Sequence, residues 1–430
     1  MGLNPLAEEL NEKIMQANPN VMGMLSDKGK AIFFPYKGIL GQSAEAKGKK
    51  INATIGIALE DDGSPMRLNS IASNISLNPK DVFTYASSYG KHELREKWKE
   101  MIYEKNPSLK DKEISLSVVT NALTHGLSMA GYMFVNEGDK VIIPDMMWGN
   151  YKLVFANAYG AEIELFNTFK DNGFDIESLK EKLNGENEKK ILVLNFPNNP
   201  TGYTPTDEEA KQITEIIKES AEKGNKIIVI CDDAYFGLVF EEGVFKESMF
   251  SYLADIHENV LAVKADGATK EDYVWGFRTG FITYGIKCSG DKNELYEALE
   301  AKTAGAVRGS ISNAPHISQS LVLNAFNSKN YAAEKQEKHE ILKGRFDKVK
   351  EILEAKEGYK EFFEALPFNS GYFMCIKLKK HDGEEIRKTL LQKYDTGLIA
   401  LGDILRVAFS AVSEDKIPEL FDNIYNACKG

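Results

Sequence analysis

Five short apolar runs without internal charges lie in the middle of this 430-residue chain. They cover residues 141–144, 191–196, 227–231, 260–263 and 281–284. Continuous apolar runs of this length, in place of alternating polar and apolar positions, are typical of strands covered on both faces, as in a parallel sheet. Amphipathic helical segments such as 207–223 separate some of the runs. This order predicts a layered α/β domain with right-handed crossovers.

The pattern changes towards the C-terminus. Apolar residues at spacings of three and four predict one long helix from about residue 328 to 355. A strand is expected near 372–378, and a further apolar segment at 405–409 precedes a terminal helix that begins at residue 414. Near the other end, the glycine- and lysine-rich stretch 41–50 predicts a flexible loop or lid, and its glycine spacing does not fit a phosphate-binding P-loop.

Composition excludes several classes of protein. The chain has 53 Lys and Arg against 64 Asp and Glu, a net charge of −11, which disfavours nucleic-acid binding through a basic face. No apolar stretch approaches the roughly 20 residues that a membrane helix needs, and the first ten residues lack the basic-then-apolar order of a secretory signal. The chain's four cysteines are isolated, which favours a cytoplasmic location and predicts neither a disulfide framework nor a metal site.

Residues that carry chemistry follow the ends of three apolar runs. Asn199 follows the second run, Asp232 and Tyr235 follow the third, and Lys270 and Arg278 follow the fourth. Ligands of an open α/β sheet bind at the carboxyl ends of its strands, so we expect these side chains to converge at one edge. Taken singly, each has an ordinary explanation as a turn, cap or surface residue. Their combined order is not expected from independent turns and caps.

This ordered set resembles the class I/II aminotransferases of the fold-type-I pyridoxal phosphate (PLP) superfamily, and within it the aspartate aminotransferase group. The family's order is NPTG, then D-x-A-Y, then a lysine, then an arginine eight residues later, and this chain has it at Asn199, Asp232, Tyr235, Lys270 and Arg278. Further segments similar to the family's are residues 51–65, 120–127, 148–151 and 405–407. The resemblance extends over roughly residues 50 to 425.

The resemblance implies a PLP-dependent transferase fold of type I. Such a fold has a large domain, with a mostly parallel mixed sheet covered by helices, and a smaller α+β domain. We accordingly expect an N-terminal arm with part of the small domain in residues 1–65, a large PLP-binding domain in 66–330 and a small domain in 331–430, entered by the long helix. The resemblance also implies a homodimer with shared active sites.

The resemblance implies PLP as cofactor and gives each matched residue a role. Lys270 would hold the cofactor aldehyde as a Schiff base and then act as general base. Asp232 would keep the ring nitrogen protonated. Tyr235 and Asn199 would hydrogen-bond the 3′ oxygen of the ring, and Trp148 would stack on its face. Lys270, Asp232 and Tyr235 are thus the expected catalytic residues.

The cofactor phosphate needs several donors. The backbone N–H groups of Ala122, Leu123 and Thr124, at the start of a helix, would supply some of them. Arg278 would add a charge-assisted pair, and Tyr85 matches a family tyrosine that reaches the phosphate of the neighbouring subunit.

Two positions depart from the family pattern. Gly267 stands where a serine or threonine phosphate donor is usual, and Thr269 is the candidate replacement. Tyr151 replaces the histidine that often lies behind the aspartate at position 232.

For the substrate, the resemblance implies two arginines. Arg406 would bind the α-carboxylate in a bidentate manner, with the backbone of Gly56 approaching the same group and Trp148 and Asn199 beside it. Arg308 would reach into the partner subunit's site and bind a side-chain carboxylate, the alternative being a plain surface arginine.

The expected activity is transfer of an amino group between an amino acid, with an aspartate or glutamate type favoured, and a 2-oxo acid. The alternatives are an aminotransferase for aromatic or other amino acids, and a PLP-dependent lyase or decarboxylase on the same fold, because the cofactor-anchoring residues do not fix the outcome. A PLP-sensing half of a transcriptional regulator is disfavoured, since the chain is acidic and we expect its enzyme-like portion to begin almost at its start.

Overall fold

The computed structural model describes residues 3–430 except 18, 20, 21, 23, 24, 33–37 and 74–76. Its centre is a seven-stranded sheet in the order β2-β10-β9-β8-β7-β3-β4. These strands are β2 (Val118–Asn121), β3 (Lys140–Pro144), β4 (Glu162–Phe166), β7 (Lys189–Asn195), β8 (Lys226–Asp232), β9 (Val260–Gly267) and β10 (Thr279–Gly285). β10 runs antiparallel to both of its neighbours, and the remaining pairs are parallel. The predicted mostly parallel mixed sheet is confirmed.

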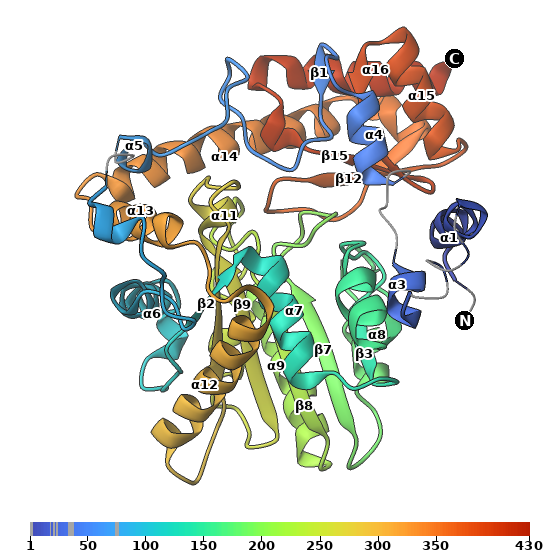
Figure 1. The fold of residues 1–430 in the computed structure, drawn as a ribbon. Coiled ribbons are helices and arrows are strands. Elements are labelled where there is room, and N and C mark those ends of the chain that lie inside the picture. The colour runs from blue at the N-terminus through green and yellow to red at the C-terminus, as the bar shows by residue number, and fades with distance from the viewer. Residues whose placement is uncertain (1–2, 18, 20–21, 23–24, 33–37, 74–76) are drawn as a thin grey trace.

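Both faces of this sheet are covered, as the uninterrupted apolar runs predict. Val229 packs into one buried cluster and its neighbour Ile230 into another, because successive strand residues point to opposite faces. One face carries α7 (Ala122–Phe134) and α12 (Lys292–Ile311), which lie in front of the sheet in Figure 1. The other carries α6 (His92–Lys105), α8 (Ile176–Lys182), α9 (Asp207–Glu222) and α10 (Met249–Leu253).

A second, antiparallel sheet lies towards the C-terminus. Its strands, in spatial order, are β11 (Phe363–Ala365), β12 (Met374–Leu378), β15 (Ile404–Val407) and β14 (Ile399–Leu401). Around it lie α14 (Tyr331–Ala355), α15 (Gly383–Lys393) and α16 (Ile417–Lys429), seen at the top of Figure 1. The short β1 (Ile51–Asn52) pairs in parallel with β13 (Thr396–Gly397), so the N-terminal segment joins this part of the molecule.

Shorter elements complete the described chain. They are α1 (Pro5–Ala17), α3 (Asp27–Ala31), α4 (Ile39–Glu45), α5 (Asn69–Ala72), α11 (Ala268–Glu271), α13 (His316–Phe326), β5 (Phe169–Lys170) and β6 (Gly173–Phe174). Across the part of the chain that is described, no helix combines the length and the apolar character that a membrane span requires. Within the same residues, no three His, Cys, Asp or Glu side chains gather as metal ligands would.

The prediction of a flexible loop over residues 41–50 is wrong for its first half. Residues up to Glu45 belong to α4, and the Gln42 side chain exchanges two hydrogen bonds with the backbone of Ala400, at 3.1 and 2.7 Å. These bonds fix the helix to β14, a contact that sequence spacing cannot indicate. The division into residues 1–65, 66–330 and 331–430 stays a prediction, and its first part includes residues outside the described set.

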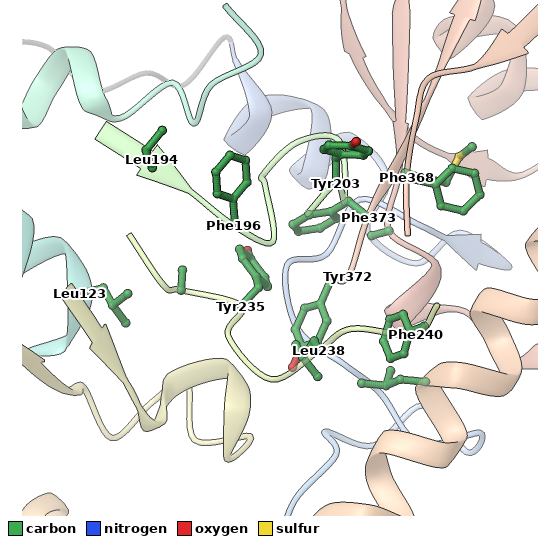
Figure 2. Close-up of a cluster of buried hydrophobic side chains, with 14 of the residues drawn as sticks. Leu123, Leu194, Phe196, Tyr203, Tyr235, Leu238, Phe240, Phe368, Tyr372 and Phe373 are labelled. Atoms are coloured by element: carbon green, nitrogen blue, oxygen red, sulfur yellow. The ribbon is translucent and has the colours of Figure 1, made fainter. Parts of the chain in front are cut away.

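Aromatic side chains join the two sheets. Figure 2 shows this cluster, in which the Tyr235 ring lies 5.3 Å from that of Tyr372 and 5.6 Å from that of Phe373, centroid to centroid. The backbones also meet directly, because the Gly202 carbonyl accepts the N–H groups of Asn369 and Ser370, each at 2.9 Å. A Cβ at Gly202 would lie 1.9 Å from the Phe373 carbonyl oxygen, so only glycine fits there.

Candidate active site

A cavity of about 210 Å³ lies at the carboxyl ends of β7, β8 and β9. Most of the residues that the sequence places at strand ends line it. The lining consists of Ala122, Leu123, Thr124, Leu127, Trp148, Asn195, Asn199, Asp232, Ala234, Tyr235, Thr269, Lys270 and Arg278. Residues from six separate segments therefore converge where an open α/β sheet binds ligands.

Lys270 lies in α11, the short helix that directly follows β9. Its Nζ is 5.0 Å from the centroid of the Tyr235 ring. Burial lowers the pKa of Lys270 to about 8; the Asp232 carboxylate opposes this change and Arg278 adds to it. The amine therefore loses its proton more readily than an ordinary lysine, and a minor fraction of it is neutral and able to act as a nucleophile or base near neutral pH.

Asp232 ends β8 and is 3% exposed. Its Oδ2 accepts a 2.6 Å hydrogen bond from Tyr151 Oη, and its Oδ1 accepts the Ala234 N–H at 3.2 Å. Burial raises the pKa of Asp232, whereas the bond from Tyr151 and the charge of Lys270 lower it. A cationic group in the cavity would offset the cost of burying this carboxylate.

Tyr151 supports Asp232 from behind, at the position where the resemblance leads us to expect a histidine. It is 1% exposed, and its ring makes an edge contact with Trp148 at 5.5 Å between centroids. Burial and the charge of Asp232 raise the pKa of Tyr151 well above its usual value. The tyrosine is therefore a neutral donor throughout the accessible pH range.

Asn195 is a lining residue that the sequence reasoning missed. Its amide nitrogen donates to the Asp232 carbonyl and its amide oxygen accepts the Asn199 N–H, both at 2.8 Å. The side chain thus joins the ends of two strands. The available signal was a polar residue inside the apolar run of residues 191–196.

The start of α7 forms one wall of the cavity. Ala122 adopts a φ of +62°, and β10 approaches so closely that a Cβ at Gly280 would lie 2.5 Å from the Ala122 carbonyl carbon. The free N–H groups at this helix start point to a site for an anion. Because these contacts are made by backbone atoms, the wall has a fixed geometry.

Two side chains beside this wall have polar groups that are not fully paired within the described chain. The Thr269 hydroxyl is buried and unpaired, and the Arg278 guanidinium donates to the Trp275 carbonyl at 3.2 Å without a carboxylate partner among the described residues. A Cβ at Gly267 would lie 2.6 Å from the Thr279 carbonyl oxygen. A serine or threonine at position 267 is therefore excluded by packing, and Thr269 offers the hydroxyl instead.

Arg406 lies on β15, next to the cavity, and is 3% exposed. Its guanidinium donates to Asn199 Oδ1 and to the Thr54 carbonyl, each at 3.2 Å, and lies over the Phe373 ring at 4.3 Å. Its Nε is buried without a partner, and within the described chain no carboxylate forms an ion pair with it. A buried guanidinium without a counter-ion favours binding of an anion.

Three predicted site residues do not reach the cavity within one chain. Tyr85 is 90% exposed, and Gly56 is exposed on the segment after β1. Arg308 is exposed near the end of α12, where its nearest hydrogen-bond partner is Ser312 Oγ at 3.4 Å. Their assigned roles stay predictions.

Residues 49–424 match the family described as aminotransferase class I and II. The chain belongs to this family. The match includes every residue that lines the cavity.

Named relatives agree with this assignment. The aspartate aminotransferase of Sulfurisphaera tokodaii is 29% identical over 251 residues, which cover 57% of this chain and 58% of that enzyme. A probable N-acetyl-LL-diaminopimelate aminotransferase of Bacillus subtilis is 26% identical over 242 residues, covering 53% of this chain and 57% of that protein. The matches thus span little more than half the length of these curated relatives.

Solved structures show the same architecture over nearly the whole chain. An aminotransferase from Anaerococcus prevotii has a TM-score of 0.83 at 25% identity, covering 95% of this chain and 100% of its own. The cytoplasmic aspartate aminotransferase of Saccharomyces cerevisiae has a TM-score of 0.77 at 18% identity, over 93% and 97% of the two chains, which shows the shared fold.

PLP is the cofactor of the class I and II aminotransferases, and the cavity residues fit it. The start of α7, the unpaired Thr269 hydroxyl and Arg278 suit its phosphate. The buried carboxylate of Asp232 suits the ring nitrogen, and the amine of Lys270 suits the aldehyde. Among the described residues, the Thr269 hydroxyl has no partner, and neither Arg278 nor Lys270 forms an ion pair with a carboxylate that the cofactor would have to displace.

Proposed function

We propose that this chain is a PLP-dependent aminotransferase that moves an amino group between a dicarboxylic amino acid and a 2-oxo acid. The observation that carries the proposal is Arg406, a buried guanidinium that lacks a carboxylate partner within the described chain and donates to Asn199 in the cavity wall. Every amino acid and every 2-oxo acid presents the carboxylate that such a site needs.

The positions of the side chains in the cavity indicate a role for each of them. The cofactor, when bound, supplies an aldehyde and a ring that accepts electrons. Asp232, held by Tyr151, would keep a proton on the ring nitrogen. The Lys270 amine, with a pKa of about 8, would act as the base that takes a proton from the substrate α-carbon. Tyr235 would hydrogen-bond the 3′ oxygen of the ring.

Substrate binding divides between the two ends of the amino acid. Arg406 binds the α-carboxylate, and the exposed backbone of Gly56 closes over it. The side-chain carboxylate is bound by the partner's Arg308, because Arg308 of the same chain is exposed and is not among the residues that line the cavity. The preference for aspartate or glutamate over apolar or aromatic amino acids depends on this second arginine.

A homodimer is part of the proposal. Phe83 is 84% exposed and Tyr85 is 90% exposed, which is unusual for large apolar side chains that lie so close together. Their loop is bound to the start of α13, where Thr84 Oγ1 meets His316 Nδ1 at 3.3 Å and Ile317 is also exposed. A second copy would cover this patch and bring the partner's Tyr85 to the phosphate.

We also propose a cytoplasmic location. The four cysteines, Cys231, Cys288, Cys375 and Cys428, are all free. Cys428 is buried, as are Cys231 in β8 and Cys375 in β12. Free thiols in this number suit a reducing compartment. Separation of cell fractions, followed by immunodetection of the chain, tests this location.

The activity is tested by incubating the purified chain with aspartate and 2-oxoglutarate. We expect oxaloacetate and glutamate in equal amounts. Pyruvate or alanine without glutamate would instead identify a lyase or decarboxylase. Replacing Arg308 with glutamine should reduce kcat/KM for aspartate about ten- to a hundredfold and leave turnover of phenylalanine nearly unchanged. An equal loss for both amino acids would contradict the dicarboxylate preference.

A further inference from the structure

A buried ionic cluster directly follows the candidate lysine in the chain. The Glu271 carboxylate forms ion pairs with Lys105 Nζ at 2.7 Å and with Lys335 Nζ at 2.6 Å. Lys335 also lies 3.4 Å from Asp272 Oδ1, which accepts a 2.6 Å hydrogen bond from Tyr331 Oη. Glu271 is 7% exposed and Asp272 is fully buried. Burial raises the pKa of Glu271, but the two lysines outweigh it and hold this pKa at about 2, so Glu271 is ionised; burial and the neighbouring Glu271 charge raise the pKa of Asp272.

The two lysines reach Glu271 from different parts of the molecule. Lys105 ends α6, a helix that packs beside the seven-stranded sheet. Lys335 lies in the second turn of α14, the long helix that runs to the C-terminal sheet above α11 (Figure 1). The side chains of Lys105 and Lys335 are 24% and 22% exposed. The cluster therefore ties α11 to both parts of the molecule through cations of similar burial.

The same turns of α14 also hold the segment that contains Gly56. Glu334 Oε2 accepts the backbone N–H of Ser70 at 2.8 Å, and Lys338 pairs with Glu60 at 3.0 Å. Three residues in two turns of one helix thus contact both the chain that follows Gly56 and the helix that carries Lys270. A shift of α14 would move both together.

The backbone around Lys270 has little support of its own. α11 has only four residues, and Tyr273 just beyond it has a φ of +57°, a conformation that disfavours residues with a side chain. The Lys270 carbonyl accepts a 3.0 Å hydrogen bond from Tyr372 Oη, which belongs to the segment before β12. Contacts from the C-terminal part of the chain therefore hold this short helix in place.

We propose that Lys335 is a positioning residue for Lys270: by joining Glu271 and Asp272 to α14, it makes the location of the Lys270 amine depend on the location of α14. This inference rests on the proposed role of Lys270. Lys105 holds the same carboxylate from the side of the sheet and lacks this coupling, so it provides a matched control.

The groups that face the Lys270 amine determine how its pKa should change when the contacts of Lys335 with Glu271 and Asp272 are lost. They are Asp232 at the end of β8, Arg278 before β10 and the ring of Tyr235. If α11 moves out of its present position, the amine leaves its buried place among these groups. Its pKa then returns towards the ordinary lysine value, since burial is the main cause of its reduction.

The test compares Lys335→Met with Lys105→Met in the full-length chain. Hydrogen–deuterium exchange of the purified protein, followed by mass spectrometry, should show about tenfold faster exchange over residues 268–275 in Lys335→Met only. After removal of the cofactor, the pH dependence of Lys270 labelling by acetic anhydride reports the pKa of the amine. Its midpoint should rise by about one pH unit or more in Lys335→Met and by a few tenths in Lys105→Met.

Two further variants keep the test decisive. Lys335→Arg preserves the charge and should retain the parental midpoint. Tyr331→Phe removes only the hydroxyl bond to Asp272 and should give a smaller shift in the same direction, even if Lys335→Met fails to fold. Equal changes in the Lys335 and Lys105 variants, or none in Lys335→Met and Tyr331→Phe, would overturn the proposal. Neither readout requires turnover, so a failure of the proposed aminotransferase activity would be seen separately, in the assay with aspartate.

Discussion

Two lysines six positions apart, Lys264 in β9 and Lys270 in α11, lie in opposite electrostatic surroundings. Lys264 is 1% exposed, contacts the Asp233 carboxylate closely and lies 3.1 Å from Asp266 Oδ2. Burial alone would lower the pKa of Lys264, but the two carboxylates outweigh it and raise this pKa. Lys270 has no carboxylate within ion-pair distance in the described chain, and its pKa falls to about 8.

Burial therefore does not decide the protonation of a lysine by itself; contact with carboxylates does. The Lys264 ammonium ion stabilises the sheet next to the cavity and keeps its proton. Its two carboxylates are in turn bonded by Ser248 Oγ, at 2.6 Å to Asp233, and by Trp98 Nε1, at 3.1 Å to Asp266. Lys270, without such partners, is available for chemistry.

The largest expected effect comes from the lysine without carboxylate contacts. Lys270→Ala should lower turnover at least about 10²–10⁴-fold, because general base catalysis contributes that much. The variant should also lose the cofactor absorbance on gel filtration. The control is Lys264→Arg, which keeps the cation and should keep bound cofactor. Retained turnover in Lys270→Ala would assign the chemistry to another group.

The second effect concerns stability. Lys264→Met should lower the free energy of unfolding by about 3–5 kcal/mol, because it leaves two buried carboxylates without their cation. Lys270→Met should leave this energy unchanged or raise it at pH 7. The folded-state pKa of Lys270 is depressed, so its burial costs stability below about pH 8, and this cost disappears as the pH rises from there towards the unfolded value.

Urea unfolding at neutral pH, followed by circular dichroism, measures both lysine variants. Equal destabilisation by Lys264→Met and Lys270→Met would show that burial outweighs carboxylate contact, and would remove the distinction between the two sites.

The third effect tests two hydroxyls that flank the cavity wall. Thr269 and Thr279 both have buried, unpaired hydroxyls, but only Thr269 lines the cavity. Thr269→Val should weaken PLP binding by about 1.5–3 kcal/mol, roughly ten- to a hundredfold, through loss of a bond to a charged phosphate. It should leave binding of pyridoxal, which lacks the phosphate, unchanged. Equilibrium dialysis of both ligands, with Thr279→Val as control, measures the difference; equal losses for PLP and pyridoxal would exclude a phosphate contact.

The smallest expected effect concerns the pKa of Asp232, the carboxylate nearest to Lys270 in the cavity. Tyr151→Phe removes the hydroxyl that lowers the pKa of Asp232, so this pKa should rise, by about one unit for a bond of ~1 kcal/mol. PLP affinity, which needs the carboxylate, should then be lost at a higher pH during acidification. Fluorescence titration between pH 4 and 8 measures the midpoint. Tyr296→Phe removes a buried hydroxyl elsewhere and should not move it, and an unmoved midpoint in Tyr151→Phe would argue against the support of Asp232 by Tyr151.

The sequence predicted most of what local pattern determines. The five apolar runs became β3, β7, β8, β9 and β10, and the long helix became α14. The edge strand β4 was missed because only one of its five residues is buried, which weakens the apolar signal. Convergence of Asp232, Lys270 and Arg278 could be expected because strand ends meet at one edge of a sheet.

What the sequence could not predict depends on contacts between distant parts of the chain. Lys335 is 64 positions from Glu271 and Gln42 is 358 from Ala400, so no local spacing indicates either pair. The exclusion of a side chain at Gly267 depends likewise on how closely β10 approaches β9. Tyr85 and Arg308 are exposed in one chain, so their predicted roles require the partner that we propose.

The backbone contact at Gly202 constrains how the molecule can move. Its carbonyl binds two N–H groups of the segment that leads into β12, and the absence of a side chain lets the two segments touch. Sliding of the C-terminal sheet along the cavity rim would break both bonds at once. Rotation about the same point would preserve these two bonds but would break the hydrogen bond from the Gly371 N–H to the Leu238 carbonyl, at 2.7 Å, so this contact holds one side of the cavity rim rigid.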